Sequence, residues 1–313
     1  MNTHFLFSVL VSSLLAGFGA RAQSPAPAAG LAAPESVAAD AAGTRFYVSN
    51  IGAKLDPAAR DGDGYVSELD ARGRVRTARL LPAPGEAPLN APKGLAVVGH
   101  TLYVADIDRI VGFDLTIRQQ TAVVSFADTK AAFLNDVLAL GDTALLVSAS
   151  DQGRAYALTL RTGRIRPLRG RAPGANGLAY DAGRGLLYVV TLGPGFNGQG
   201  QLLCRPLAEA GEFAALPVAP GFFDGVAVQP DGQVLYSDWV SLAANPPAQG
   251  AVWRYNPATR QATAVPLPAG TPSPADFCYD ARRNQLLVPS TLSSRVVVVP
   301  VPAGKSPASH PAK

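Results

Sequence analysis

The sequence has few of the residues on which several common kinds of active site depend. Among its 313 residues there are three histidines and two cysteines. The histidines are His4, in an apolar leader, His100, in an expected hairpin turn, and His310, near the C-terminus. This inventory excludes Ser-His-Asp and Cys-His catalysis, and it excludes a zinc site built from histidine or cysteine ligands.

Long apolar runs and charge clusters are also scarce. The apolar run over residues 5–18 is shorter than the roughly 18–20 residues that span a bilayer, and the small-residue pattern Ala20-Arg21-Ala22 follows it. We therefore expect a signal peptide over residues 1–22, a linker over 23–33, and a periplasmic or secreted protein without a membrane anchor after cleavage. The net charge is only +4 and basic residues lack interleaved aromatics, which argues against nucleic-acid binding.

The chain instead repeats one β-strand pattern six times. Each repeat begins with a turn rich in Pro, Gly, Asn or Asp, continues into an apolar strand, and returns in a second apolar strand. The openings lie about 40 to 60 residues apart, which suits a four-stranded propeller blade. They are Pro34-Glu35-Ser36-Val37, Pro92-Lys93-Gly94-Leu95, Leu134-Asn135-Asp136-Val137, Ala175-Asn176-Gly177-Leu178, Phe223-Asp224-Gly225-Val226 and Pro274-Ala275-Asp276-Phe277. The sequence predicts an all-β fold, a six-bladed β-propeller over residues 34–301.

The two ends of the propeller are expected to close weakly. The sixth repeat shows three strands and then a Pro/Ser/Lys-rich tail over residues 302–313, which we expect to be disordered. Residues 25–33 are a poor strand sequence, so the fourth strand of the last blade is expected to be loose or missing. Cys204 and Cys278 fall in non-adjacent repeats, which predicts two free buried thiols rather than a disulfide.

Polar residues occupy one position of the inner strands where packing alone would select apolar ones. Two places before the first apolar residue of each inner strand stand Glu35, Lys93, Asn135, Asn176, Asp224 and Ala275. Inner strands line the central channel of a propeller, so these side chains are expected to converge at one mouth. Turn preference is the simpler explanation, but it accounts only for Asn-Gly and Asp-Gly and not for Glu35 or Lys93.

Three long loops are expected at the same mouth, over residues 51–64, 192–200 and 239–250. They belong to the repeats that hold Glu35, Asn176 and Asp224, and long loops around a polar set typically build a pocket. Two carboxylates and two amide oxygens form an all-oxygen donor set. Such a set suits a hard divalent cation, Ca²⁺ first, with Mg²⁺, Mn²⁺ or Zn²⁺ as alternatives.

The openings Pro34-Glu35, Asn135-Asp136, Asn176-Gly177-Leu178 and Asp224-Gly225-Val226 resemble those of the senescence-marker-protein/gluconolactonase/luciferin-regenerating-enzyme family of six-bladed propellers. The resemblance covers essentially the whole mature chain. It implies that Glu35, Asn176 and Asp224 ligate a divalent cation and that Asn135 lies beside the metal and the substrate. It also implies a hydrolase of the lactonase or esterase type that acts on a small molecule, with Asp224 as the catalytic base. We expect a monomer.

Two residues depart from the family pattern, and both are expected to contact the substrate. Phe133 stands where sugar-lactonase members have Arg, which favours a less polar substrate than an aldonolactone. Lys93 falls within the polar ring, where its ammonium would repel a cation or replace it by pairing with Glu35 or Asp224. The alternative is therefore a non-catalytic propeller that binds a ligand or a protein through this face. A strictosidine-synthase-like propeller, with different ring residues, is a third option.

Several short motifs match known sites only in part. Residues 193–198 fit G-x-G-x-x-G but lack the βαβ context of a dinucleotide site. Asp61-Gly62-Asp63-Gly64 lacks the glutamate that ends an EF-hand loop, so a tight turn is expected. The strand-ending residues Asn50, Asp106 and Asp238 are expected to cap their own turns. Trp239 is either a pocket wall or a packed aromatic, and the sequence leaves the role of Asp276 open.

Overall fold

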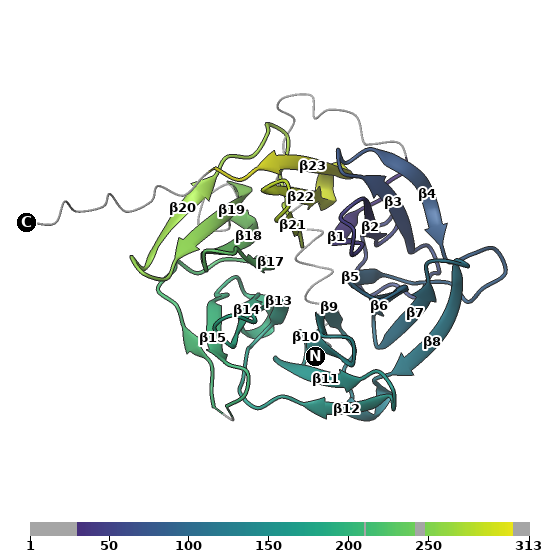
Figure 1. Ribbon diagram of the computed structural model, residues 1–313, viewed down its shortest axis with the longest axis horizontal. Helices are drawn as coiled ribbons and strands as arrows, with labels where there is room; N and C mark the ends of the chain where they lie inside the picture. Colours follow the sequence, from purple (N-terminus) through teal and green to yellow (C-terminus); the bar gives the residue numbers. More distant parts are fainter. Residues whose placement is uncertain (1–29, 210, 242–247, 303–313) are drawn as a thin grey trace, which may run out of the picture.

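Six small antiparallel sheets are arranged around a common axis in the computed structural model, which describes residues 30–209, 211–241 and 248–302 (Figure 1). The predicted six-bladed β-propeller is thus confirmed. The expected signal peptide and most of the expected C-terminal tail lie outside the described residues. Among the described residues, no helix has the length and apolar character needed to span a membrane.

Each blade is one sheet whose strands follow one another in chain order from the axis outward. Blade 1 contains β1 (Pro34–Ala39), β2 (Arg45–Asn50), β3 (Tyr65–Asp70) and β4 (Val75–Leu81), and blade 2 contains β5 (Pro92–Val98), β6 (Thr101–Asp106), β7 (Arg109–Asp114) and β8 (Gln119–Ser125). Blade 3 contains β9 (Leu134–Leu140), β10 (Ala144–Ala149), β11 (Arg154–Thr159) and β12 (Arg164–Pro167). Blade 4 contains β13 (Ala175–Asp181), β14 (Leu186–Thr191), β15 (Leu202–Pro206) and β16 (Ala214–Ala215).

The last two blades differ in length and in strand number. Blade 5 contains β17 (Phe223–Val228), β18 (Val234–Ser241), β19 (Ala248–Asn256) and β20 (Gln261–Val265). β18 and β19 extend into residues 239–250, where the sequence predicts a loop. Blade 6 contains β21 (Cys278–Asp280), β22 (Gln285–Ser290) and β23 (Arg295–Pro300). Within the described part of the chain it has three strands, as expected from the sequence.

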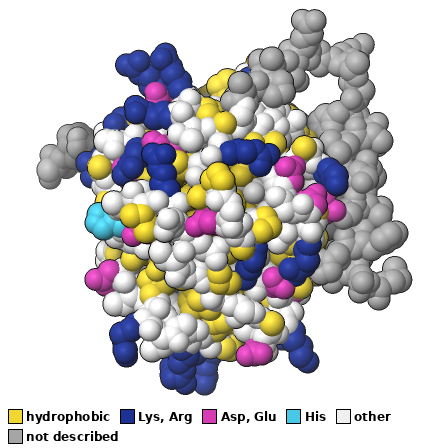
Figure 2. Space-filling model, turned by 90° about the vertical axis from the view of Figure 1, so that its right-hand side faces the viewer, with side chains coloured by type: hydrophobic (Ala, Val, Ile, Leu, Met, Phe, Trp, Pro, Cys, Tyr) yellow, Lys and Arg dark blue, Asp and Glu magenta, His cyan; other side chains and the backbone are white. Residues whose placement is uncertain are grey.

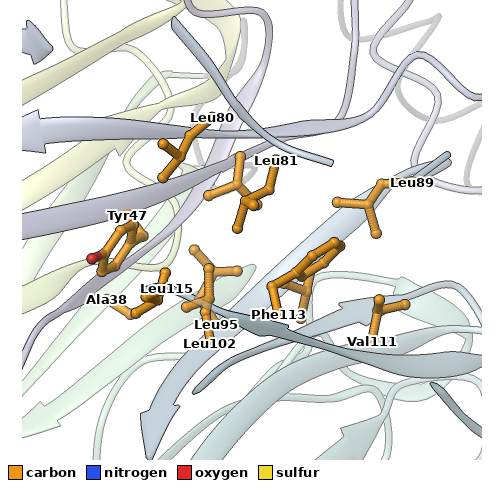
Figure 3. Packing of buried hydrophobic residues seen from close by; sticks show 12 residues of the cluster. Ala38, Tyr47, Leu80, Leu81, Leu89, Leu95, Leu102, Val111, Phe113 and Leu115 are labelled. Carbon is orange, nitrogen blue, oxygen red and sulfur yellow. The ribbon is translucent and has the colours of Figure 1, made fainter. Parts of the chain in front are cut away.

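The core consists of apolar layers between neighbouring blades. The layer between blades 1 and 2 illustrates the arrangement: Tyr47 from β2 and Leu81 from β4 pack with Leu102 and Phe113 from β6 and β7 (Figure 3). Leu81, Leu102 and Phe113 are completely buried. Alternation along each strand places these side chains on one face, where each contributes about 1.5–3 kcal/mol by leaving water.

The side of the ring formed by blades 1 and 2 carries mixed side chains rather than charges of one sign (Figure 2). Arginine and lysine are scattered there among acidic and apolar residues. The two cysteines are free, as predicted, but both are only partly buried. The expectation of buried thiols therefore holds only in part, since Cys204 and Cys278 pack against apolar clusters of the core but keep some exposure.

Blade 6 meets blade 1 through contacts near the axis. Ser36 and Asp276 form a parallel β-bridge, and the N–H of Asp276 donates to the carbonyl of Glu35 at 3.0 Å. Residues 30–33, placed in the linker by the sequence analysis, also pack here. The Ala33 N–H donates to Ser294 Oγ of blade 6 at 3.2 Å, so these residues help to join the two ends of the ring.

Candidate functional site

The polar ring is built on an irregularity that recurs in the inner strands. In five blades the pairing of inner and second strands shifts register at the ring residue: between Pro34 and Val37, Pro92 and Leu95, Leu134 and Val137, Ala175 and Leu178, and Phe223 and Val226. A β-bulge adds one residue to one strand and re-aims its side chains, often next to active sites. The bulge therefore turns Glu35, Lys93, Asn135, Asn176 and Asp224 toward the axis.

Serine hydroxyls of the second strands hold three of these bulges. Ser49 Oγ accepts the N–H of Ser36 at 3.0 Å, and Ser148 Oγ accepts that of Asp136 at 2.8 Å. Ser237 Oγ accepts the N–H of Gly225 at 2.7 Å. A backbone N–H freed from the strand ladder must find another acceptor when it is buried, so these serines stabilise the bulged conformation.

Glycine at the second bulge position allows neighbouring inner strands to approach closely. A Cβ on Gly177 would lie 2.3 Å from the carbonyl oxygen of Asp224 in the next blade. A Cβ on Gly94 would lie 2.4 Å from Cα of Asp136. These distances are impossible for a side chain, so the Asn-Gly and Lys-Gly pairs serve blade packing as well as the turn.

All six residues assigned to the site from the sequence line one pocket at the mouth of the channel. Its cavity has a volume of about 60 Å³. The polar lining consists of Glu35, Lys93, Asn135, Asn176, Asp224 and Thr291, and the apolar lining of Ile51, Leu55, Pro57, Phe133, Leu192, Phe222 and Trp239. The three loops expected at this mouth all contribute. A polar floor beneath apolar walls is typical of small-molecule sites.

Two carboxylates in the floor have oxygens without a partner. Glu35 and Asp224 are each 7% exposed, and Glu35 Oε2 and Asp224 Oδ1 accept no hydrogen bond. Burial, followed by the charge of Asp224, raises the pKa of Glu35 well above its ordinary value. Burial also raises the pKa of Asp224 to about 7, while the Asn176 side chain lowers it. Two buried, partly unsatisfied carboxylates favour a bound cation or a bound proton.

The two amides are oriented by hydrogen bonds to the backbone and to a serine. Asn176 Nδ2 donates to the carbonyl of Phe223 at 3.1 Å, and Asn135 Nδ2 donates to Ser150 Oγ at 3.2 Å. Ser150 Oγ donates in turn to the carbonyl of Ala175 at 2.6 Å. Each amide nitrogen donates one of its two N–H groups to the protein, and this orientation leaves the amide oxygen available to a ligand.

Lys93 does not pair with the carboxylates of the floor. Its ammonium donates to the carbonyls of Pro57 at 2.8 Å and Ala91 at 3.1 Å, and it lies 4.5 Å from the centroid of the Phe133 ring. None of the ion pairs within the described residues includes Lys93. Burial lowers its pKa to about 8, against the opposing effect of Glu35. The ammonium therefore does not take the place of a cation between Glu35 and Asp224.

The donor set fits a hard cation. Over the described residues, no group of three or more His, Cys, Asp or Glu is arranged to hold a metal ion. A metal would therefore depend on Glu35, Asp224 and amide oxygens together, with the two unpartnered carboxylate oxygens as its strongest ligands. Oxygen donors of this kind suit Ca²⁺ or Mg²⁺ better than Zn²⁺.

Behind the ring lie two carboxylates to which the sequence analysis gave no role in the site. Asp136 accepts the N–H groups of Val137 and Leu178, both at 2.6 Å, and Asp276 Oδ2 accepts the Ser36 hydroxyl at 2.5 Å. Asp136 thus connects blades 3 and 4, and Asp276 connects blades 6 and 1. The charge of Asp136 adds to the burial that raises the pKa of Glu35 and of Asp224. Burial, and then the charges of Asp136, Glu35 and Asp224, raise the pKa of Asp276. Each directly follows a ring position, which is the signal that marks them.

The strand-ending residues were expected to cap their own turns, but they accept N–H groups of a more distant segment. Asn50 Oδ1 accepts the N–H of Ala32 at 3.0 Å, Asp106 Oδ1 accepts that of Ala91 at 2.9 Å, and Asp238 Oδ1 accepts that of Phe222 at 3.0 Å. Each acceptor joins the end of a second strand to the segment that enters the inner strand of its own blade. These residues position the ring and do not belong to it.

The partial motifs of the sequence also have structural explanations. Asp63 Oδ2 accepts the N–H of Ala53 at 2.8 Å and Asp61 lies 3.6 Å from Lys54, so the Asp-Gly-Asp-Gly segment is a turn, as expected. In the glycine-rich loop, Phe196 is buried, and the centroid of its ring lies 5.7 Å from the centroid of the Phe133 ring. Trp239 is a pocket wall, and its Nε1 donates to Thr291 Oγ1 at 3.3 Å.

The similarity of this chain to known proteins lies in its fold. No protein-family model matches the chain, and no curated protein matches it. Among solved structures, it is similar to regucalcin from Agrobacterium tumefaciens, described as a calcium-binding protein, with a TM-score of 0.63 and 16% identity over 87% of this chain and 90% of that one. It is also similar to virginiamycin B lyase from Staphylococcus aureus, solved with quinupristin, with a TM-score of 0.55 and 12% identity over 86% and 94%. A chain of a nidogen/laminin complex gives a TM-score of 0.55 and 17% identity over 74% and 78%.

Proposed function

We propose that this propeller is a divalent-cation-dependent hydrolase that opens a lactone or a similar ester of a small molecule. The observation that carries the proposal is the pair of buried carboxylates, Glu35 and Asp224, each with an unpartnered oxygen in the floor of the pocket. The likeness in fold to regucalcin, together with the resemblance of the strand openings to the gluconolactonase family, supports the same assignment.

In this proposal Glu35, Asn176 and Asp224 bind the cation, and Ca²⁺ is the preferred ion. When bound, the cation supplies a Lewis acid that polarises the carbonyl group of the substrate. Asp224 accepts a proton from the attacking water. In the cation-free chain burial raises its pKa to about 7, and a bound cation would lower that pKa, so that the carboxylate is ionised at neutral pH, as a general base must be.

The other lining residues would orient the substrate and limit the access of water. The Asn135 amide oxygen is free to accept a hydrogen bond from a hydroxyl group or a water molecule beside the reacting carbonyl. Phe133, Phe222 and Trp239 form apolar walls, and none of them provides the multiple hydrogen bonds that a sugar lactone requires. The pocket therefore favours an aliphatic or aromatic lactone over an aldonolactone.

The first test is calorimetric titration of Ca²⁺, Mg²⁺ and Mn²⁺ into the purified chain after EDTA treatment. We expect one tight site in the wild type and its loss in Asp224→Asn. Asp231→Asn, at an exposed turn, is the matched control and should bind as the wild type does. Hydrolysis of δ-decalactone is then compared with that of glucono-δ-lactone, with the former expected to be faster. Absence of any bound cation, or turnover that survives in Asp224→Asn, would contradict the proposal.

A non-catalytic binding propeller is the second candidate, because a buried lysine stands in the ring. It is supported by likeness in fold to a chain of a nidogen/laminin complex, which is a binding assembly. Ligand binding without turnover of any ester, and without a cation, would favour it.

Export and the monomeric state are separate proposals that rest on the sequence alone. N-terminal sequencing of the protein from a periplasmic or secreted fraction should begin at Gln23 if residues 1–22 are cleaved. Light scattering should give the mass of one chain. A retained leader or a larger assembly would contradict these two proposals without affecting the pocket.

A further inference from the structure

Lys93 places a buried positive charge in the pocket without an ion-pair partner. Its side chain is 1% exposed and lines the cavity. Its two hydrogen-bond acceptors, the carbonyls of Pro57 and Ala91, are neutral groups. In the described part of the chain no carboxylate lies within ion-pairing distance of the ammonium.

The position of the ammonium is fixed. The Pro57 carbonyl comes from the loop between β2 and β3, the Ala91 carbonyl comes from the segment entering β5, and the Phe133 ring lies 4.5 Å away from blade 3. Contacts from three directions prevent the side chain from turning toward Glu35. A buried charge that is not paired is costly, whereas methionine would fill the same volume without that cost. The retained charge therefore indicates that the counter-anion comes from a ligand.

The pocket separates its charges. The charge of Glu35 acts on Lys93 and opposes the burial that lowers its pKa, but the two groups form no ion pair, and Asp224 is not among the groups whose charge affects the pKa of Lys93. An anionic group of a ligand is therefore repelled from the carboxylates and attracted to Lys93. The cavity of about 60 Å³ admits a compact group such as a carboxylate, and the apolar walls formed by Leu55, Phe133 and Trp239 extend from it toward the mouth.

We propose that Lys93 determines specificity by binding a carboxylate of the substrate, so that the substrate class is a small, otherwise apolar lactone or ester that carries a carboxylate. The lactone or ester part rests on the proposed function. Binding of the carboxylate does not, because it requires neither a cation nor turnover. A single ammonium that donates to a carboxylate forms a charge-assisted hydrogen bond, which is stronger than one between neutral groups.

The test compares hexanoate with hexanamide, which have the same apolar chain but differ in charge. Binding of each to the full EDTA-treated chain is measured by ligand-observed NMR titration. We expect hexanoate to bind about 10-fold more tightly than hexanamide. In Lys93→Met the two affinities should become equal. Lys54→Met serves as the control, since Lys54 is 77% exposed, and it should keep the preference of the wild type.

Equal affinity of the two probes for the wild type, or a preference that survives in Lys93→Met, would overturn the inference. If Lys93→Met does not fold, the inference is tested on the wild type alone by comparing hexylammonium with hexanoate. Tighter binding of hexylammonium would overturn the inference without any variant. Failure of the proposed function has a different signature. It would appear as absence of cation binding and of lactone hydrolysis while hexanoate is still preferred.

Discussion

At the scale of single residues, the carboxyl of Asp224 makes the free energy of unfolding depend on pH. Burial raises its pKa in the folded state to about 7 from an ordinary value of 3.8. Between these two values the folded chain binds more protons than the unfolded chain, so the free energy of unfolding falls as the pH rises. We expect the cation-free protein to lose roughly 2–4 kcal/mol of stability from about pH 4 to about pH 7, and little more above that.

Urea unfolding in EDTA at several pH values measures this loss. Glu35, Asp136 and Asp276 also have raised pKa values, so Asp224→Asn should reduce the slope over the same range without abolishing it, and the variant should be more stable than the wild type at pH 8. Asp231→Asn, at the exposed turn before β18, should keep the slope. A wild-type stability that rises between pH 4 and 7 would show that Asp224 is not held in this environment. Added Ca²⁺ should restore stability at pH 8 by binding the folded state.

Some features of single residues could be predicted from the sequence, and others could not. That Glu35, Asn176 and Asp224 line one pocket was predictable, because each stands at the same place in a short local pattern. The orientation of Lys93 was not, since it depends on carbonyls from Pro57 and Ala91 and on the Phe133 ring, which three different segments bring together. Local sequence does not encode contacts of that kind.

At the scale of elements, the bulged inner strand is the unit that places each ring residue. Gly177 in β13 is a sensitive point, because a Cβ there would lie 2.3 Å from the backbone oxygen of Asp224 in β17. We expect Gly177→Ala to destabilise the fold by about 1–3 kcal/mol through overpacking and to displace Asp224. Thermal unfolding measures the first effect, and Ca²⁺ titration measures the second.

Gly211→Ala is the matched control for Gly177→Ala. No atom lies within 4 Å of the Cβ that would be added at Gly211, so its stability and cation affinity should be those of the wild type. If Gly177→Ala behaves like the control, the close approach of β13 and β17 does not define the site.

The strands themselves were predictable to within a few residues, because alternation and turn residues are local signals. The register shift that turns the ring residues inward was not, although the pairs Asn176-Gly177 and Asp224-Gly225 mark where it occurs. The link from Asp136 to the N–H of Leu178 crosses from one blade to the next. Its donor is a backbone group, which leaves no trace in the sequence.

At the scale of the whole molecule, the closure of the ring lacks an outer strand shared between the two ends, at least among the described residues. The ends are joined instead by small contacts, among which Ser36 Oγ donates to Asp276 Oδ2 and Gln285 Nε2 donates to the carbonyl of Ala71 at 3.0 Å. The number of repeats predicted this ring. The poor strand sequence before Pro34 predicted that blade 6 lacks a fourth strand where the ring closes. The individual contacts across it could not be predicted, since they join residues more than 200 positions apart.

Arg283 provides a direct comparison between this junction and an internal one. Its NH1 donates to Asp280 Oδ2 and to the carbonyl of Gly43 in blade 1, each at 2.8 Å. Arg184 has the equivalent place in blade 4: it donates to Asp181 Oδ2 at 2.8 Å and to the carbonyl of Asp231 in blade 5 at 3.2 Å. The two arginines are similarly exposed, at 50% for Arg184 and 41% for Arg283.

The chain runs continuously from blade 4 to blade 5, whereas only noncovalent contacts join blade 6 to blade 1. Loss of one contact at the closing junction should therefore lower the cooperativity of unfolding as well as its midpoint. We expect Arg283→Ala to cost about 1–2 kcal/mol, for a lost charge-assisted hydrogen bond, and to broaden the urea transition. Arg184→Ala should cost less than 1 kcal/mol and leave the width unchanged, since the chain itself keeps blades 4 and 5 connected. Equal effects of the two substitutions would mean that the closing junction is as strong as a continuous one, and that the contacts of Ser36 and Asp276 at the axis are sufficient to close the ring.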